Sequence, residues 1–408
     1  GWTHYTNTST GTTANDGTHI GTNGTDTYIW NRESASIYLG TNATTRMKID
    51  DNSRISLSNN DSGESNNTVF GKSAFNVSGD NGSDYNTAVG ELAMGTNAVS
   101  GSTYNVALGY KALTEAIDCD FNIAIGANSM LIADSGESNN ISIGTNAMNA
   151  IDNSGSDYNV VIGDSALLGG TGIVQKNIAI GANAMGTGVA NNDQEGTIAI
   201  GHDALIALTS GAGNVAIGYQ SGKAITTGGN NVAAGYNAML EHQTGAGNVV
   251  IGKDAMFNSN NHAAAENVFI GIQSGGGNWA ATANYNVGVG SYTLMGAMNG
   301  GQFNTAVGQS SLRNLTEGDD NVGIGFFAGT AVTTGSKNIC IGKSAGAAMD
   351  TQSSAVLIGW TAGQNINDND ASNTVAIGGE SLQALTTGQG NVAVGAGTLY
   401  YEDDGDFN

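Results

Sequence analysis

The chain has no proline among its 408 residues and only two cysteines, Cys119 and Cys340. Proline removes a donor from a β-ladder, so its complete absence fits a chain that is paired strand to strand along its length. The two cysteines lie more than two hundred residues apart, too far to be bridged across a stack of coils. We therefore expect two free thiols, with Cys340 serving as a small buried apolar residue.

Charge is also scarce, and most of it has one sign. Charged residues make up 12% of the chain, and the net charge is −23. Such an acidic surface argues against a nucleic-acid backbone or an anionic membrane as partner. No apolar run approaches the roughly 18 residues of a membrane-spanning helix, so we expect no membrane insertion. The acidic turns at residues 80–84 and 152–157 could hold Ca²⁺, but neither follows a known calcium-loop spacing, and we expect solvated turns and no cofactor.

The sequence shows no catalytic motif. The five histidines stand alone, without the neighbouring histidine or cysteine of a metal site. No nucleophile elbow, phosphate loop or His-Glu-x-x-His occurs. Catalysis usually makes one unit of a repeat different, whereas these units are alike. We expect no enzyme, no catalytic residue and no metal ligand.

The chain is rich in glycine, with 63 residues, and many of these glycines belong to one recurring sequence motif. The motif is an Asn, three apolar or small residues and a Gly, as in residues 214–218 and 391–395. The closing glycines stand at 71, 90, 109, 126, 144, 163, 181, 201, 218, 235, 252, 271, 290, 308, 325, 342, 359, 378 and 395, every 17 to 20 residues. A fixed short period is the signature of a solenoid, so we predict a mainly β rod of about 19 coils.

Each coil begins with a predicted strand in the three residues before its Gly. The outer two are mostly Val or Ile, and the one between them is usually small. Since successive strand residues point to opposite faces, we expect Val and Ile to fill the coil with Leu and Met. We expect the small residues to form a face on which chains approach one another: Ala88, Ala107, Ala124, Ala216 and Ala393.

The position four before the Gly is Asn in all but three copies, the exceptions being Thr197, Ala355 and Thr374. Stacked asparagines can bond copy to copy along a solenoid, or they can form a ligand array. We favour the structural ladder because every coil needs it. Its members are Asn67, Asn86, Asn105, Asn122, Asn140, Asn159, Asn177, Asn214, Asn231, Asn248, Asn267, Asn286, Asn304, Asn321, Asn338 and Asn391.

The second half of the coil follows its own pattern. Two residues after the Gly comes a frequent Ser, Thr, Asn or Asp, such as Asn128, Asp203, Asn237 or Ser344, and then a small residue and a Leu or Met. A polar residue ahead of such a pair resembles a helix N-cap. We expect one or two helical turns there, with a second short strand as the alternative.

The position directly after the Gly is variable, which indicates exposure. It includes the aromatic residues Tyr110, Tyr219, Tyr236, Phe326 and Trp360. Exposed rings beside Asn and Asp suit stacking on sugars, so these are candidate surface-binding residues. Scattered surface aromatics are the other interpretation.

The two ends differ from the repeat. Residues 1–60 lack the period but contain short alternating segments, which predicts a β region that caps the solenoid or connects it to what precedes it. Residues 61–408 form the solenoid shaft. The last residues, 405–408, match the opening of a repeat, so we expect the shaft to continue beyond the chain end.

The repeat, Asn-Val-Ala-Ile-Gly followed after two further residues by Ala-Leu or Ala-Met, resembles those in bacteriophage tail and collar fibres and is similar to head repeats of trimeric autotransporter adhesins. Residues 37–50 look like the segment that precedes such repeats in phage fibres. The resemblance implies a homotrimeric rod on a virion or other extracellular surface. It also implies attachment to a host glycan or protein through the rod or a separate tip. A bacterial adhesin or filament subunit is the alternative, and a polysaccharide- or ice-binding solenoid ranks third.

Overall fold

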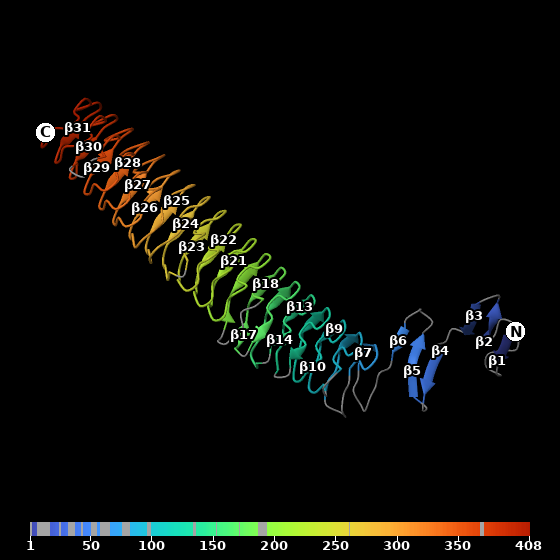
Figure 1. Ribbon diagram of the computed structural model, residues 1–408. Helices are drawn as coiled ribbons and strands as arrows, with labels where there is room; N and C mark the ends of the chain where they lie inside the picture. Colours follow the sequence, from blue (N-terminus) through green and yellow to red (C-terminus); the bar gives the residue numbers. More distant parts are fainter. Residues whose placement is uncertain are drawn as a thin grey trace.

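The computed structural model describes residues 2–5, 17–23, 26–31, 37–41, 44–49, 55–57, 66–75, 82–95, 99–133, 136–151, 153–170, 172–186, 194–260, 262–367 and 371–408. Over these residues the protein is β-structure and turns, without a helix. The chain winds from β7 to β31 into a long parallel β-solenoid (Figure 1). The predicted fold class is therefore confirmed.

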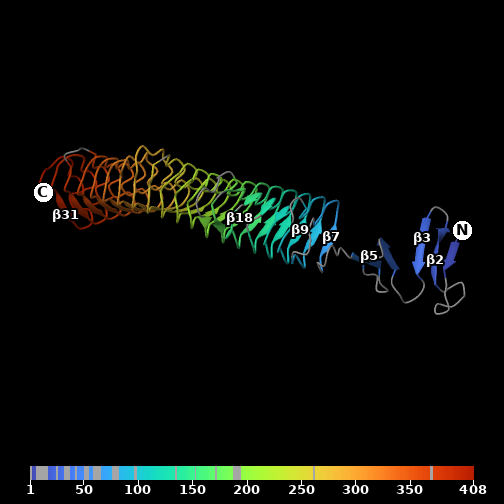
Figure 2. The same cartoon turned by 90° about the horizontal axis from the view of Figure 1, so that it is seen from below.

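The N-terminal region forms antiparallel strands that do not belong to the solenoid. The first sheet contains β1 (Trp2–Tyr5), β2 (Thr18–Asn23) and β3 (Asp26–Asn31), and the second contains β4 (Ile37–Thr41), β5 (Thr44–Ile49) and β6 (Ile55–Leu57). Both precede the β7 end of the rod (Figure 2). The alternation in this part of the sequence thus marks real strands, and the capping role stays a prediction.

One parallel sheet runs the length of the solenoid. Each of its strands has three residues, those directly before a closing Gly, and each pairs in register with the strand of the next coil. The sheet is open, since β7 and β31 lie at opposite ends of the rod (Figure 1). Its strands within the described residues are β7 (Thr68–Phe70), β8 (Thr87–Val89), β9 (Val106–Leu108), β11 (Ile123–Ile125), β13 (Ile141–Ile143), β15 (Val160–Ile162), β18 (Ile178–Ile180), β20 (Ile198–Ile200), β21 (Val215–Ile217), β22 (Val232–Ala234), β23 (Val249–Ile251), β24 (Val268–Ile270), β25 (Val287–Val289), β26 (Thr305–Val307), β27 (Val322–Ile324), β28 (Ile339–Ile341), β29 (Val356–Ile358), β30 (Val375–Ile377) and β31 (Val392–Val394).

A second strand per coil, the alternative to a helical turn, forms only in part of the rod. Two-residue strands pair in parallel there, in one sheet of four and one of two. They are β10 (Glu115–Ala116), β12 (Ile132–Ala133), β14 (Ala150–Ile151) and β16 (Gly169–Gly170), then β17 (Val174–Gln175) and β19 (Gln194–Glu195). Elsewhere among the described residues this side of the coil consists of turns.

The predicted helical turn after the Gly is wrong. Asn128 and Met130 both have positive φ, 56° and 48°, so the backbone alternates in hand and cannot continue as a helix. Their N–H groups donate to other coils, Asn128 to the Tyr110 carbonyl at 2.9 Å and Met130 to the Ala147 carbonyl at 3.0 Å. Asp203, Asn237 and Ser344 have the same left-handed backbone. The polar residue therefore marks a left-handed position, which Asn and Asp tolerate, and not an N-cap.

The small residue of each strand points into the coil, so the proposed chain–chain face is also wrong. Ala88, Ala107, Ala124 and Ala216 are fully buried within one chain, and Ala393 is 3% exposed. A coil of 17 to 20 residues encloses little space, and the Leu or Met of the following turn, such as Met130 or Leu205, already fills much of it. The inner side of the strand is therefore small in most coils, with Val161, Val250, Phe269 and Leu357 as larger buried exceptions, and the Val and Ile beside it point outward.

Five coils have Gly where the others have Leu, Met or Phe, and other apolar side chains compensate in the core. An added Cβ at Gly222 would lie 3.0 Å from Ile225 Cδ1 and 2.8 Å from Leu205 Cδ2. In the last of these coils Ile366 occupies the same place beside Gly363. In four of the five coils a residue three positions later thus supplies the volume that the turn residue lacks, and at Gly275 the Phe269 ring occupies it.

The closing Gly is required by both conformation and space. Gly235 has φ of +141°, and an added Cβ would lie 2.5 Å from the carbonyl oxygen of Gly252 in the next coil. The same contact recurs along the column, for example from Gly252 to Gly271. A side chain there would have to displace backbone, so the invariance of the Gly is steric.

Candidate functional site

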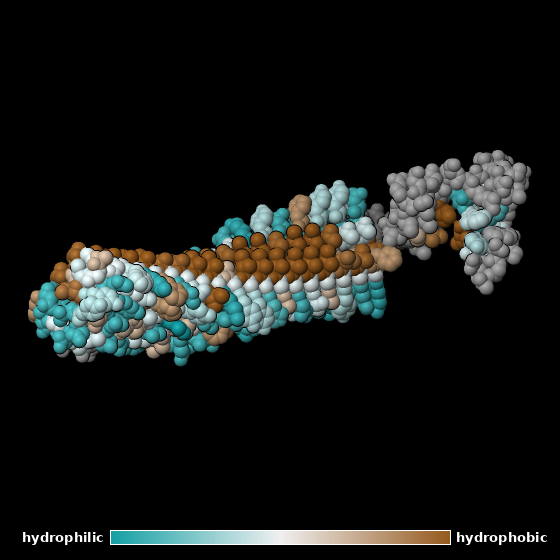
Figure 3. Space-filling model, turned by 90° about the horizontal axis from the view of Figure 1, so that it is seen from above, coloured by the Kyte–Doolittle hydropathy of each residue, from teal (hydrophilic) through white to brown (hydrophobic). Residues whose placement is uncertain are grey.

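The outward residues of the long sheet form an exposed apolar stripe along the rod. We define the apolar stripe as the first and third residues of the strands listed for that sheet. These positions hold Val, Ile, Leu, Phe, Ala or Thr and never a charged residue. Ile217 is 44% exposed and Ile251 is 39% exposed, whereas Ala216 between two stripe residues is fully buried. Figure 3 shows the stripe as a continuous hydrophobic band.

The size of the stripe is unusual for a single chain. Eighteen steps of about 4.8 Å make it about 90 Å long, and two outward residues make it about 10 Å wide, on the order of 900 Å². Soluble monomers rarely expose a continuous apolar patch beyond a few hundred Å². A standard protein–protein interface buries about 800 Å² per partner. The stripe therefore has the area and composition of an interface.

Two further columns of exposed residues border the stripe. The leading column lies two residues before each strand, and the trailing column lies two residues after it, directly behind the Gly. Every described leading residue with a side chain is exposed and has a positive φ, as at Tyr104 (59°) and Lys176 (56°). The predicted surface-binding aromatics Tyr110, Tyr219, Tyr236, Phe326 and Trp360 occupy the trailing column and are all exposed.

Aromatic rings in both columns stack on one another from coil to coil. In the leading column Tyr85 lies on Tyr104 with ring centroids 4.8 Å apart, and Tyr104 lies on Phe121 at 5.0 Å. In the trailing column Tyr219 stacks on Tyr236 at 5.2 Å. Stacking covers the ring faces that a sugar would need, so these rings present mainly their edges. Phe326 and Trp360 do not neighbour each other, because Lys343 occupies the coil between them.

Sequence reasoning missed the leading-column aromatics and the exposed side of the strand. The leading aromatics are Tyr85, Tyr104, Phe121, Tyr158, Tyr285, Phe303 and Phe407. The signal was present, because the leading and trailing columns lie an even number of residues from the outer strand positions and therefore share their face. The leading and trailing columns vary from coil to coil and include charged residues, and both lie on the outer surface of the solenoid.

The asparagine column is buried and bonded through the solenoid. Asn231 Nδ2 donates to Asn214 Oδ1 at 3.2 Å and to the Gly245 carbonyl at 3.0 Å. Its Oδ1 accepts from the backbone N–H and the side-chain amide of Asn248, both at 3.0 Å. The same pattern links Asn304, Asn321 and Asn338. These amides are engaged within the chain, which supports the structural ladder over a ligand array for this column.

Buried titratable groups are present, but they do not form a reactive site. Cys119 and Cys340 are both free, as expected, and Cys340 is buried, as expected. Cys119 is buried as well, and burial raises the pKa of each thiol to about 12. Burial lowers the pKa of His242 to about 4, while its Nδ1 lies 3.2 Å from Ser259 Oγ. Among the described residues no group of three or more His, Cys, Asp or Glu side chains is placed to hold a metal ion.

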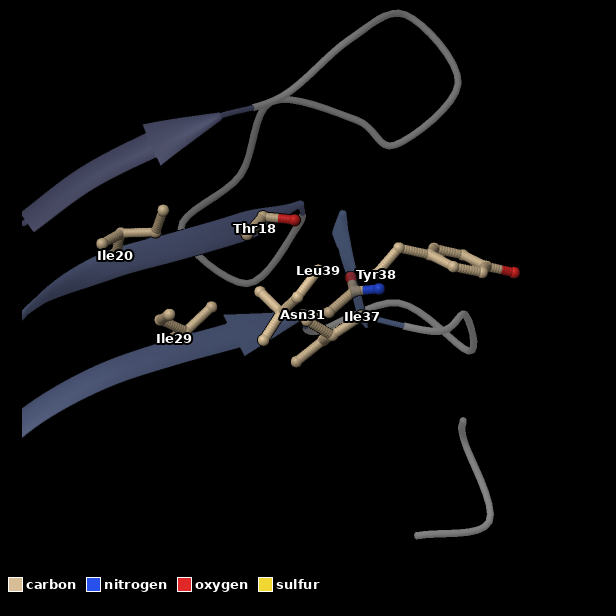
Figure 4. Close-up of a pocket in the computed structure, with 7 residues that line it drawn as sticks. All are labelled: Thr18, Ile20, Ile29, Asn31, Ile37, Tyr38 and Leu39. Atoms are coloured by element: carbon tan, nitrogen blue, oxygen red, sulfur yellow. The ribbon is translucent and has the colours of Figure 1, made fainter. Parts of the chain in front are cut away.

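The two acidic turns considered for Ca²⁺ are described only in part, since residues 80, 81 and 152 lie outside the described residues. The described chain contains no helix that could span a membrane. An open pocket of about 300 Å³ lies between the N-terminal sheets (Figure 4) and has no ionisable group apart from the Tyr38 hydroxyl; its lining is Thr18, Ile20, Ile29, Asn31, Ile37, Tyr38 and Leu39.

Comparison of the chain with protein-family models, with curated proteins and with solved structures gave no match.

Proposed function

We propose that this chain is the shaft of a homotrimeric bacteriophage tail or collar fibre, which holds a binding tip away from the particle and toward a glycan or protein of the host-cell surface. The observation that carries the proposal is the apolar stripe, whose side chains are partly or fully exposed along the solenoid. Its occupant is two further copies of the chain. The resemblance of the repeat and of residues 37–50 to phage fibres supports the biological setting.

The width of the exposed face supports three chains. From leading to trailing column the chain spans six residues, about 20 Å at about 3.3 Å per residue. Three such faces form a triangular prism whose sides lie about 6 Å from the axis. That is close to half of the roughly 10 Å that separates packed sheets. The Val and Ile of three stripes would thus meet at the centre without leaving a channel.

Charge favours the same arrangement. Residues 61–408 carry a net charge of −22, with eight basic and thirty acidic residues. The stripe is uncharged. If three acidic chains associate through it, the electrostatic repulsion between them is lower than if they associated through their acidic surfaces. A trimer would also bury each chain's stripe, and a stiff rod with buried apolar surface suits a mechanical role.

The test is the native mass of the 408-residue chain, by light scattering coupled to size-exclusion chromatography. We expect about three times the 41.1 kDa of one chain. The double variant Ile217→Asp/Ile251→Asp places charge on the stripe and should have the mass of one chain with an unchanged circular dichroism spectrum. The matched control Thr227→Asp/Thr244→Asp changes two exposed turn residues off the stripe and should remain trimeric.

A wild-type mass of one or two chains would refute the trimer. The phage setting has a separate test, which is the genes next to the one encoding this chain. Neighbours that encode tail and baseplate proteins would support it. A membrane anchor encoded downstream would instead place the rod on a cell surface.

A further inference from the structure

We infer that neighbouring protomers interlock at the edges of the prism, where the trailing column of one chain inserts beside the leading column of the next, offset toward the following coil. This inference rests on the trimer proposed above and specifies its chain-to-chain register. In a three-fold arrangement all strands run the same way around the axis. The end of each strand therefore approaches the start of the strand in the next protomer.

The height of the two columns restricts which coils can meet. Three-fold symmetry keeps equivalent residues at one height, while the chain climbs one coil of about 4.8 Å per repeat. A trailing residue is reached six residues after the leading residue of its coil. It therefore lies between the partner's leading residues of the same coil and of the next coil.

Charge decides between these two registers. The same-coil register sets the trailing Lys343 against the leading Lys337 of the partner. The next-coil register sets Asp164 against Lys176 and Lys253 against Glu266. Like charges brought together at an interface are costly, whereas opposite charges at its rim fix the register. All of these side chains are exposed in the single chain.

Side-chain size is consistent with the next-coil register. There the trailing His202 and Tyr236 meet the leading Gly213 and Gly247, which leave room for a ring. At another level the trailing Tyr110 meets the leading Phe121, the last ring of the Tyr85 stack. Aromatic side chains are enriched in the cores of protein interfaces. The edge would thus alternate between ring-to-glycine and ring-to-ring contacts.

The test is disulfide cross-linking in the full chain. The pair Asp164→Cys/Lys176→Cys reports the next-coil register, and Asp164→Cys/Tyr158→Cys is the matched control for the same-coil register. Leading residues 158 and 176 have nearly equal φ, 60° and 56°, so both accept the substitution under similar backbone conditions. Within one chain each pair lies on opposite sides of the stripe, about 20 Å apart, beyond the reach of a disulfide. The buried Cys119 and Cys340, whose pKa values are raised to about 12, remain unreactive in the folded chain.

After mild oxidation, non-reducing denaturing electrophoresis should show covalent trimers for the 164/176 pair and at least tenfold less for the 164/158 pair. The pair Lys253→Cys/Glu266→Cys should repeat the result at a second level, and it replaces the first pair if that variant does not fold. Cross-linking of the 164/158 pair alone overturns the register. A native mass of three chains with no cross-linking overturns the edge contact but leaves the trimer, and a native mass of one chain overturns both.

Discussion

Replacing Asn231 by Ala tests whether the asparagine ladder stabilises the rod. The substitution removes the amide donor to the Gly245 carbonyl and the acceptor for the backbone N–H of Asn248. Both backbone groups lie in the buried part of the coil. A buried polar group left without its partner costs about 1–3 kcal/mol. We therefore expect Asn231→Ala to destabilise the local structure by about 2–6 kcal/mol.

The loss should be local, because each coil contacts mainly its neighbours. Amide hydrogen exchange followed by mass spectrometry measures this directly. At about 3 kcal/mol, exchange protection of peptides containing Asn248 should fall by roughly two orders of magnitude, since each 1.4 kcal/mol is a factor of ten. Peptides many coils away should be unchanged.

The control is Asn278→Ala, which removes an exposed Asn that accepts one bond from Asn260 at 2.9 Å. Exposed substitutions of this kind change stability by about 0.5 kcal/mol or less. The rod already lacks the Asn at Thr197, Ala355 and Thr374, and the residue at 355 is Ala, so Asn231→Ala should still fold. If peptides containing Asn248 were equally protected from hydrogen exchange in the two variants, the asparagine hydrogen bonds would not stabilise the rod, and the reasoning would be refuted.

Two further predictions concern pH and the closing glycine. The pKa of His242 is about 4 in the folded chain and 6.5 in the unfolded chain. Between these pH values the imidazole is protonated in the unfolded chain but neutral in the folded chain. Stability should fall by about 3 kcal/mol between pH 6.5 and 4. Denaturant midpoints at pH 7.5 and 4.5 should therefore differ less in His242→Asn than in wild type, and an equal difference would exclude this histidine as the cause. Gly235→Ala forces a Cβ within 2.5 Å of the Gly252 carbonyl oxygen and should cost at least about 2–3 kcal/mol. Gly379→Ala, whose Cβ would meet only the Trp360 oxygen at 3.9 Å, should be tolerated, and similar thermal midpoints for the two variants would contradict the steric account.

The period of the sequence was sufficient to predict the solenoid, the strand positions and the burial of Cys340, whereas the burial of Cys119 was not predicted. It did not reveal which side of the strand faces inward. Alternation says that Val215 and Ile217 share a face and that Ala216 lies on the other, but not which face encloses the core. Hydrophobicity suggested Val and Ile, whereas in this narrow coil Leu205 and Ile225 already occupy the interior beside Gly222, and the buried strand residue is Ala216.

The turn was mispredicted for a related reason. Residues such as Asn128 and Met130 carry helical signals, but their N–H groups find carbonyl partners in the coils above and below. Backbone hydrogen bonds between coils replace the hydrogen bonds within a helix, so the contacts between repeats override the local helix preference. The exposed columns could be located by counting an even number of residues from the outward strand positions. The residues that contact them in a partner chain could not be located, because a single sequence does not show which chains pack together.

The variable length of the coil has a consequence for how such a rod changes over generations. The coils differ by up to three residues, yet the sheet keeps its register throughout, from β7 to β31. The differences in coil length lie in the turns that connect one strand of the long sheet to the next. Gain or loss of one whole repeat therefore leaves the pairing register of the remaining strands unchanged. Recombination between repeats would therefore lengthen or shorten the shaft in increments of about 4.8 Å. The length of the solenoid can therefore change in steps of one coil while the strand register is kept.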